Sequence, residues 1–109
     1  MTLKDLGQLY WLHKEIDMDT RCLRELGPEA DDIRAIIEDK LARCIRERDA
    51  LEDYIAAIDD DFTRQVFILR FAEGLSWERV AACMGGKNSS AAVRMIVRRH
   101  IAKTGRRTP

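Results

Sequence analysis

The sequence predicts an all-α protein in which an N-terminal helical hairpin precedes a three-helix unit. Three observations predict this class. Glycine and proline are scarce, with six and two among 109 residues, and hydrophobic residues make up 46% of the chain, a composition typical of a folded protein. Apolar residues recur at spacings of three, four and seven, which is the helical period. Segments that alternate apolar and polar residues, as strands do, are nearly absent.

The first helix is predicted over residues 3–26. Its apolar stripe consists of Leu9, Leu12, Ile16, Leu23 and Leu26. The stripe is heptad-like, so it could pack as a coiled coil, although Asp19 interrupts it and it spans few heptads. Gly27-Pro28 predicts the end of this helix and the start of the next, because proline is tolerated in the first turn of a helix.

The second helix is predicted from Pro28 to about Ile58. Its apolar stripe consists of Ile33, Ile37, Leu41, Cys44, Leu51, Ile55 and Ile58. Two amphipathic helices joined by a short turn predict an antiparallel hairpin. Because neither helix can bury its stripe alone, the hairpin must pack on itself, on the rest of the chain or on another subunit. We therefore assign residues 1–59 to an acidic hairpin that dimerises or binds a partner, and residues 60–109 to a second domain.

The second domain contains three shorter helical patterns separated by two turns. One of Asp59, Asp60 and Asp61 is expected to cap a helix over residues 62–73, which Gly74 ends in the left-handed conformation. Ser76 is expected to cap a helix over residues 77–84, and Gly85-Gly86 ends it. Asn88 or Ser89 can cap the third, which extends to about Lys103. The predicted core consists of Val66, Leu69, Val80, Ala81, Met84, Val93, Val97 and Ile101.

The segment LRFAEGLSWERVAACMG, residues 69–85, resembles the second half of sigma-70 region 4, the helix-turn-helix domain that reads the promoter −35 element. Leu69-Arg70-Phe71, Gly74-Leu75-Ser76, Val80-Ala81 and Met84-Gly85 carry the resemblance. The connection from Gly85 to Val93 is longer than is usual in that family. Similar lengthened turns occur in RinA- and ArpU-type sigma-like regulators of phages. The resemblance implies a DNA-binding transcription regulator and places Arg64 and Arg70 near the DNA backbone, although Arg70 could instead pair with Glu73.

The charge distribution independently favours a polyanionic partner. The formal net charge is zero, yet residues 1–63 carry a net charge of −8 and residues 86–109 carry +7. Such asymmetry predicts that the basic end binds a polyanion such as duplex DNA. The predicted contact residues are Lys87, Ser89, Ser90, Ala91, Arg94, Arg98, Arg99 and Lys103. Arg94 is expected to read a base, since guanidinium can bind guanine bidentately, and the other cations, together with Arg106 and Arg107 in a frayed tail from Thr104, to contact phosphates.

Two other functions fit the same pattern. A phage small terminase subunit also joins a helix-turn-helix to helical oligomerisation elements, and ring assembly would favour it. A module that has lost DNA binding and instead contacts RNA polymerase or a sigma factor would use the basic helix on an acidic protein.

Catalytic, metal and cofactor sites are not expected. The two histidines have no triad-like partners, and the chain has no phosphate-binding glycine loop. The three cysteines contain no CxxC pair, and Cys44 and Cys83 are expected to pack in the core. Because the sequence shows neither a signal peptide nor an apolar run near the roughly 20 residues of a membrane span, we expect a cytoplasmic protein with no small-molecule substrate.

Overall fold

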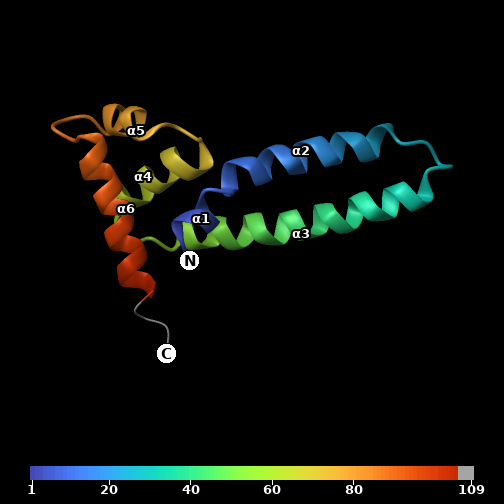
Figure 1. Cartoon of the computed structure of the whole chain (residues 1–109), viewed down its shortest axis with the longest axis horizontal. Coiled ribbons are helices and arrows are strands. Elements are labelled where there is room, and N and C mark those ends of the chain that lie inside the picture. The colour runs from blue at the N-terminus through green and yellow to red at the C-terminus, as the bar shows by residue number, and fades with distance from the viewer. Residues whose placement is uncertain (106–109) are drawn as a thin grey trace.

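The computed structural model describes residues 1–105, and all regular elements among them are helices, which confirms the all-α class. Its elements are α1 (Leu3–Leu6), α2 (Leu9–Glu25), α3 (Asp31–Ala56), α4 (Asp61–Phe67), a π-helical turn η1 (Ile68–Ala72), α5 (Trp77–Met84) and α6 (Ser90–Gly105). α2 and α3 lie antiparallel and form a long arm, and α4, α5 and α6 gather at one end of it (Figure 1). The molecule is therefore elongated, with extents of 57 × 36 × 19 Å.

The N-terminal helix is broken, which the sequence pattern did not predict. Thr2 caps α1 in a capping box with Asp5, whose carboxylate accepts a hydrogen bond from the Thr2 backbone N–H at 3.1 Å. The helix stops at Gly7, and α2 begins two residues later. Both Leu6 and Leu9 are fully buried. The break therefore brings an additional leucine into the core, so the expectation of one continuous helix over residues 3–26 was wrong.

The connection at the far end of the arm also differs from the expectation. α3 begins at Asp31, so Pro28 lies in the connecting loop rather than in the first turn of the helix. The guanidinium of Arg34 donates hydrogen bonds to the carbonyls of Leu23 at 3.3 Å and Leu26 at 3.0 Å. These bonds satisfy carbonyls that the end of α2 leaves without helical partners. A side chain from the next helix, not the proline, secures this end.

Burial of the apolar stripe on α3 decreases along the arm. Leu51 and Ile55 are buried where the arm meets the other helices, Ile37 and Cys44 are half-buried, and Ile33 is 55% exposed. The reason is geometric, because two helices alone can cover only part of each other. The expected stripe is present, but only its proximal half forms a core.

The acidic interruption of the α2 stripe is buried against a lysine from α3. Asp19 is only 6% exposed, and its Oδ2 lies 3.4 Å from the Nζ of Lys40. The same ammonium donates a hydrogen bond to Glu15 at 2.7 Å, which is the main cause of the raised pKa of Lys40. The interruption is thus paired across the hairpin, where it can fix the register of the two helices.

The expected caps of the C-terminal helices are confirmed. The Asp60 carboxylate accepts hydrogen bonds from the backbone N–H and hydroxyl of Thr63, at 2.8 and 2.7 Å, which lower the pKa of Asp60. Ser76 caps α5 with a bond of 3.2 Å from the Arg79 N–H. Ser89 rather than Asn88 caps α6, through a bond of 3.1 Å from the Ala92 N–H, while the Asn88 amide donates to the Gly85 carbonyl at 2.7 Å.

The helix predicted over residues 62–73 continues beyond α4 as a π-helical turn. The Glu73 N–H donates to the Ile68 carbonyl at 3.0 Å, a bond that spans five residues instead of four. Gly74 then adopts the expected left-handed conformation, with φ of +72°. The π turn brings Phe71 into the core, where it is 4% exposed.

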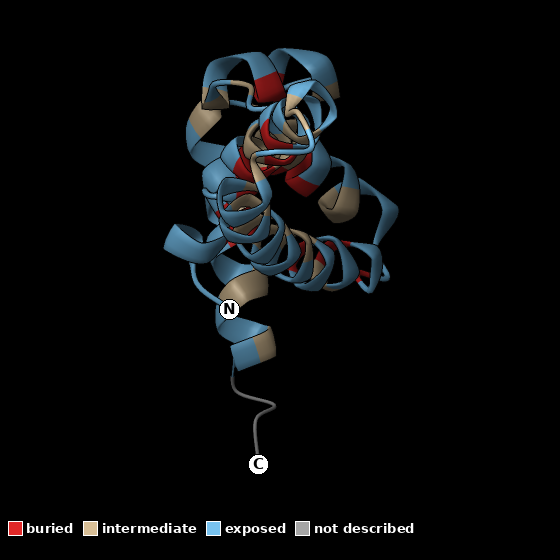
Figure 2. Ribbon diagram, turned by 90° about the vertical axis from the view of Figure 1, so that its right-hand side faces the viewer, coloured by how far each residue is buried: buried red, intermediate tan, exposed pale blue. Residues whose placement is uncertain are grey.

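One hydrophobic core joins both halves of the chain (Figure 2). Five of the predicted core residues of the C-terminal half are buried, and Leu69, Met84 and Ile101 are partly buried against them. The ring of Phe67 packs near those of Phe71 and His100, with centroids 5.5 and 5.3 Å apart. Of the cysteines expected in the core, Cys44 packs against it half-buried, but Cys83 is exposed, so that expectation was wrong for Cys83. α5 contributes too little apolar surface to enclose it.

Within residues 1–105, no helix combines the length and apolar character needed to cross a membrane.

Candidate nucleic-acid interface

α6 has one apolar face and one basic face. Val93 and Val97 are fully buried, and four-residue spacing places them on the same side of the helix. The predicted contact residues of α6 that lie elsewhere on the helix are exposed: Ala91, Arg94, Arg98, Arg99 and Lys103. Packing of the apolar face therefore fixes the direction in which the basic side chains project.

The turn before α6 adds Lys87, Ser89 and Ser90 to this surface. Lys87 and Ser89 are exposed and Ser90 is half-buried. The Ser89 hydroxyl oxygen accepts the capping bond from Ala92, so the hydroxyl keeps its proton for donation to another group. Of the two serines expected to face base edges, Ser89 is the more accessible.

The tail begins later than expected. Thr104 and Gly105 belong to α6, and the Thr104 hydroxyl lies 2.7 Å from the Tyr54 hydroxyl. The expectation of a frayed tail from Thr104 was therefore wrong for these two residues, because Tyr54 of α3 holds the end of the helix. Arg106 and Arg107, the other predicted phosphate contacts, lie outside the described residues.

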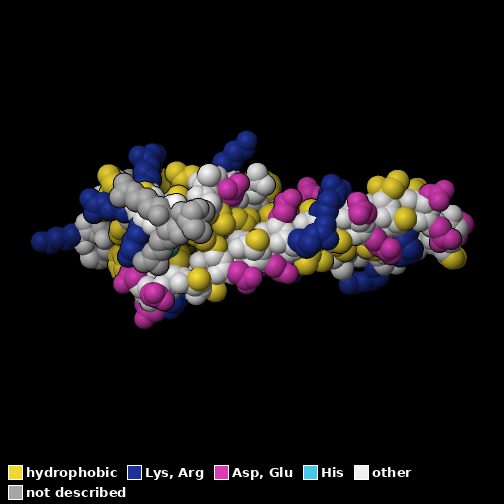
Figure 3. Space-filling view, turned by 90° about the horizontal axis from the view of Figure 1, so that it is seen from below, with side chains coloured by type: hydrophobic (Ala, Val, Ile, Leu, Met, Phe, Trp, Pro, Cys, Tyr) yellow, Lys and Arg dark blue, Asp and Glu magenta, His cyan; other side chains and the backbone are white. Residues whose placement is uncertain are grey.

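Within the described part of the chain, the basic residues of this surface have no acidic partner. Among residues 1–105, none of Lys87, Arg94, Arg98, Arg99 and Lys103 forms an ion pair, whereas lysine and arginine residues of the arm pair with acids at several points. Figure 3 shows basic side chains projecting from the end that holds α6 and acidic side chains along the arm. The acidic and basic parts of the sequence therefore lie in different parts of the folded molecule.

Arg70 lies beside α6 rather than pairing with Glu73. Its guanidinium donates to the Leu75 carbonyl at 2.8 Å and lies 4.4 Å from the centroid of the Trp77 ring. Arg94 approaches the same ring to 5.9 Å. Partial burial, and then the charge of Arg94, lower the pKa of Arg70. Two arginines and a tryptophan therefore form one surface that joins η1, α5 and α6.

Arg64 forms hydrogen bonds within the protein rather than projecting as a free basic side chain. It donates to the Ile58 carbonyl at 2.8 Å and to the Asp61 carboxylate, so it ties the end of α3 to α4. Within the described residues, no three histidine, cysteine, aspartate or glutamate side chains lie close enough together to hold a metal ion.

The sequence did not predict the part that Trp77 plays in this surface. Trp77 is the first residue of α5, is half-buried and lies between the guanidinium groups of two arginines. The juxtaposition of Trp77 and Arg70 was foreseeable in principle, since they flank one short turn. Arg94 is 17 positions further along the chain than Trp77, and only the packing of α5 on α6 brings it there.

The geometry suits binding of an extended anion, because α6 is held by its apolar face and another side carries a row of exposed cations that form no ion pair among the described residues. No protein-family model, curated protein or solved structure matches the chain.

Proposed function

We propose that this protein is a sequence-specific duplex-DNA-binding regulator of transcription, acting on phage or mobile-element genes. The observation that carries the proposal is the exposed basic face of α6, whose cations have no acidic partners within residues 1–105. The resemblance of residues 69–85 to the helix-turn-helix of sigma-70 region 4 is the reason for assigning the protein to transcription. α5 would be the first helix of that motif and α6 the recognition helix.

In this proposal the position of a residue along α6 decides whether it contacts bases or phosphates. Ala91, Arg94 and the Ser89 hydroxyl, near its N-terminal end, would meet base edges in the major groove. Arg98, Arg99 and Lys103, further along, and Lys87 in the turn would contact phosphates and supply affinity without sequence preference. The net negative charge of the arm would keep it away from DNA and orient the basic end toward it.

The arm would provide contacts with a second copy or with RNA polymerase. Met18 in the middle of α2 and Ile33 and Ile36 near the start of α3 are 52%, 55% and 70% accessible. Exposed large apolar side chains are typical of interaction surfaces where they form a contiguous patch. A homodimer would present two recognition helices, as many helix-turn-helix proteins do.

Selection from a random duplex pool tests the proposal. The wild-type protein should enrich one sequence, and Arg94→Ala should bind it more weakly by about 1–3 kcal/mol while discriminating less at one base position. Arg99→Ala should weaken binding to all duplexes alike. Arg46→Ala is the matched control, because Arg46 is an exposed arginine on the arm. Failure to enrich any sequence, or equal effects of Arg94→Ala and Arg46→Ala, would refute sequence-specific recognition by α6.

A further inference from the structure

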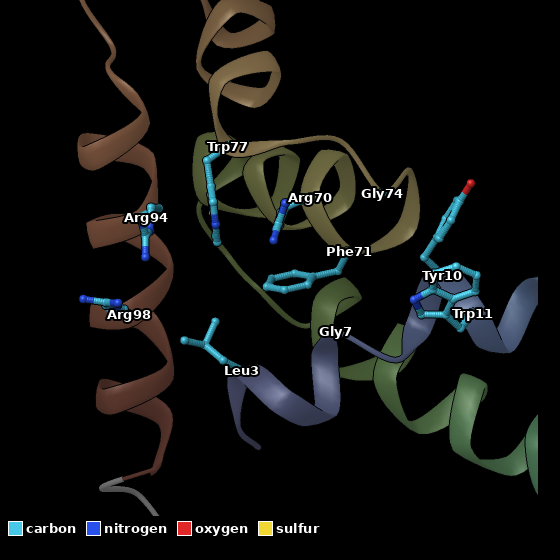
Figure 4. Close-up of a pocket in the computed structure, with 10 residues that line it drawn as sticks. All are labelled: Leu3, Gly7, Tyr10, Trp11, Arg70, Phe71, Gly74, Trp77, Arg94 and Arg98. Atoms are coloured by element: carbon cyan, nitrogen blue, oxygen red, sulfur yellow. The ribbon is translucent and has the colours of Figure 1, made fainter.

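A cavity of about 390 Å³ opens between the start of the arm and the C-terminal helices. Residues of α1, α2, η1, α5 and α6 surround it, and Figure 4 shows their side chains around the opening. Its volume falls in the range of small-molecule binding sites, roughly 300–1,000 Å³. The cavity exists only because the hairpin packs against the basic end of the molecule.

Among residues 1–105, three arginines line the cavity, and no carboxylate does. They are Arg70, Arg94 and Arg98. The guanidiniums of Arg70 and Arg94 lie 4.4 and 5.9 Å from the centroid of the Trp77 ring, which stands between them (Figure 4). Like charges held close together repel each other, and partial burial weakens the screening by water. An oxyanion bound beside Arg94 and Arg98, which lie one turn apart on α6, would reduce this repulsion and accept charge-assisted hydrogen bonds.

Aromatic rings provide the other walls. Tyr10 and Trp11 form an edge-to-face pair with centroids 5.6 Å apart, and Phe71 and Trp77 form another at 6.4 Å. Trp11 is 62% exposed, which is unusual for so large an apolar side chain. Flat aromatic surfaces beside guanidiniums suit a ligand in which a planar ring is joined to a negatively charged group.

The walls are held in place by close packing. Gly74 allows the ring of Tyr10 to lie directly on the turn before α5, where even a methyl group would come within 2.9 Å of the ring. The Arg70 bond to the Leu75 carbonyl fixes the same turn. This wall of the cavity is therefore held in place before a ligand binds, which reduces the ordering cost of binding.

We propose that this cavity binds a small anion that carries a planar ring, of the chemistry of a free mononucleotide. The phosphate would lie beside Arg94 and Arg98 of α6, and the base would extend past Trp77 toward Trp11 (Figure 4). Because Arg94 and Arg98 are also proposed DNA contacts, such a ligand would compete with duplex DNA and act as an effector. The competition rests on the proposed function, whereas binding of the ligand to the cavity does not.

Calorimetry of the full chain without DNA tests the site, with adenosine and guanosine monophosphates as probes. At least one mononucleotide should bind more tightly than ribose phosphate, which lacks the ring, and more tightly than the nucleosides, which lack the phosphate. Arg98→Gln should weaken binding about tenfold, as expected for the loss of one charge-assisted hydrogen bond. Arg79→Gln is the matched control, since Arg79 is exposed on α5 and does not line the cavity.

The two tryptophans of the chain are Trp11 and Trp77, and both line the cavity. Their indole N–H signals in nuclear magnetic resonance spectra should therefore both shift on binding. Absence of binding at millimolar nucleotide, equal affinity for ribose phosphate, or equal effects of Arg98→Gln and Arg79→Gln would overturn the site. Nucleotide binding without DNA binding would support the site and refute the proposed function. DNA binding without nucleotide binding would overturn the site alone.

Discussion

Gly74 lies directly against the ring of Tyr10 from the N-terminal half of the chain, and Gly74→Ala should be strongly destabilising. Two costs add. A non-glycine residue at φ of +72° costs about 1–2 kcal/mol. The new Cβ would also lie 2.9–3.0 Å from three ring carbons of Tyr10, closer than the roughly 3.5 Å optimum for carbon contacts. Overpacking of this kind costs about 1–3 kcal/mol, so we expect a total loss of about 2–5 kcal/mol.

Gly86→Ala separates the two costs. Gly86 also has a positive φ, of +64°, but a Cβ there would meet no atom within 4 Å. This variant should therefore lose only the conformational part, about 1–2 kcal/mol. In a Tyr10→Ala background, Gly74→Ala should lose its additional cost, because the ring is gone.

The assay is urea unfolding followed by circular dichroism, with the four variants of the Tyr10–Gly74 cycle and Gly86→Ala measured together. The coupling between Tyr10 and Gly74 should be about 1–3 kcal/mol. Equal losses for Gly74→Ala and Gly86→Ala, or no coupling in the cycle, would refute the contact between the arm and the turn. The unfolding slope should stay unchanged if the halves unfold together.

Three further predictions concern the cap, the arm and its exposed end. Hydrogen bonds in the folded state lower the pKa of Asp60. Its stabilising effect should therefore be complete above the unfolded pKa of about 3.9 and be lost as the pH falls through the lower pKa of the folded state. Asp60→Asn should flatten this part of a curve of unfolding free energy against pH. In urea unfolding, Asp19→Leu should increase stability by about 1 kcal/mol, because it replaces a buried carboxylate by apolar surface while the half-exposed Lys40 keeps its ion pair with Glu15, whereas Asp17→Leu, on the exposed face, should change it little. If the arm pairs with a second copy, Ile36→Glu should shift the sedimentation coefficient to that of a monomer, and Ala42→Glu, at another exposed position of α3, should not; identical sedimentation of both variants and wild type would place any partner elsewhere.

Local features of this fold could be predicted from the sequence because their causes lie within a few residues. Ser76 caps α5 and Gly74 takes a positive φ, as predicted from a glycine at a helix end followed two residues later by a serine before an apolar helix. Valines four apart on one helix, such as Val93 and Val97, are buried together. The all-α class follows from the same periodicity extended over the chain.

Other features depend on contacts that periodicity does not encode. A hydrophobic stripe shows which face of a helix is apolar, but not how much of that face finds a partner, so the exposure of Ile33 was not foreseen. The break at Gly7 depends on the room for Leu6 in a core made mostly by later residues. The candidate interface was predicted as a set of residues, whereas the cavity beside it arises from Tyr10 meeting Gly74, 64 positions apart in the chain.

The dependence of DNA affinity on salt tests the central claim most directly. Fluorescence anisotropy with a labelled duplex should give a slope of log affinity against log salt of roughly −3.5 to −5.5, as expected for about four to six phosphate contacts. Arg98→Ala should reduce the slope by about one unit, and Arg46→Ala on the arm should leave it unchanged. Absence of binding at low salt, or the same slope for Arg98→Ala and wild type, would contradict the assignment of α6 as a DNA-binding helix.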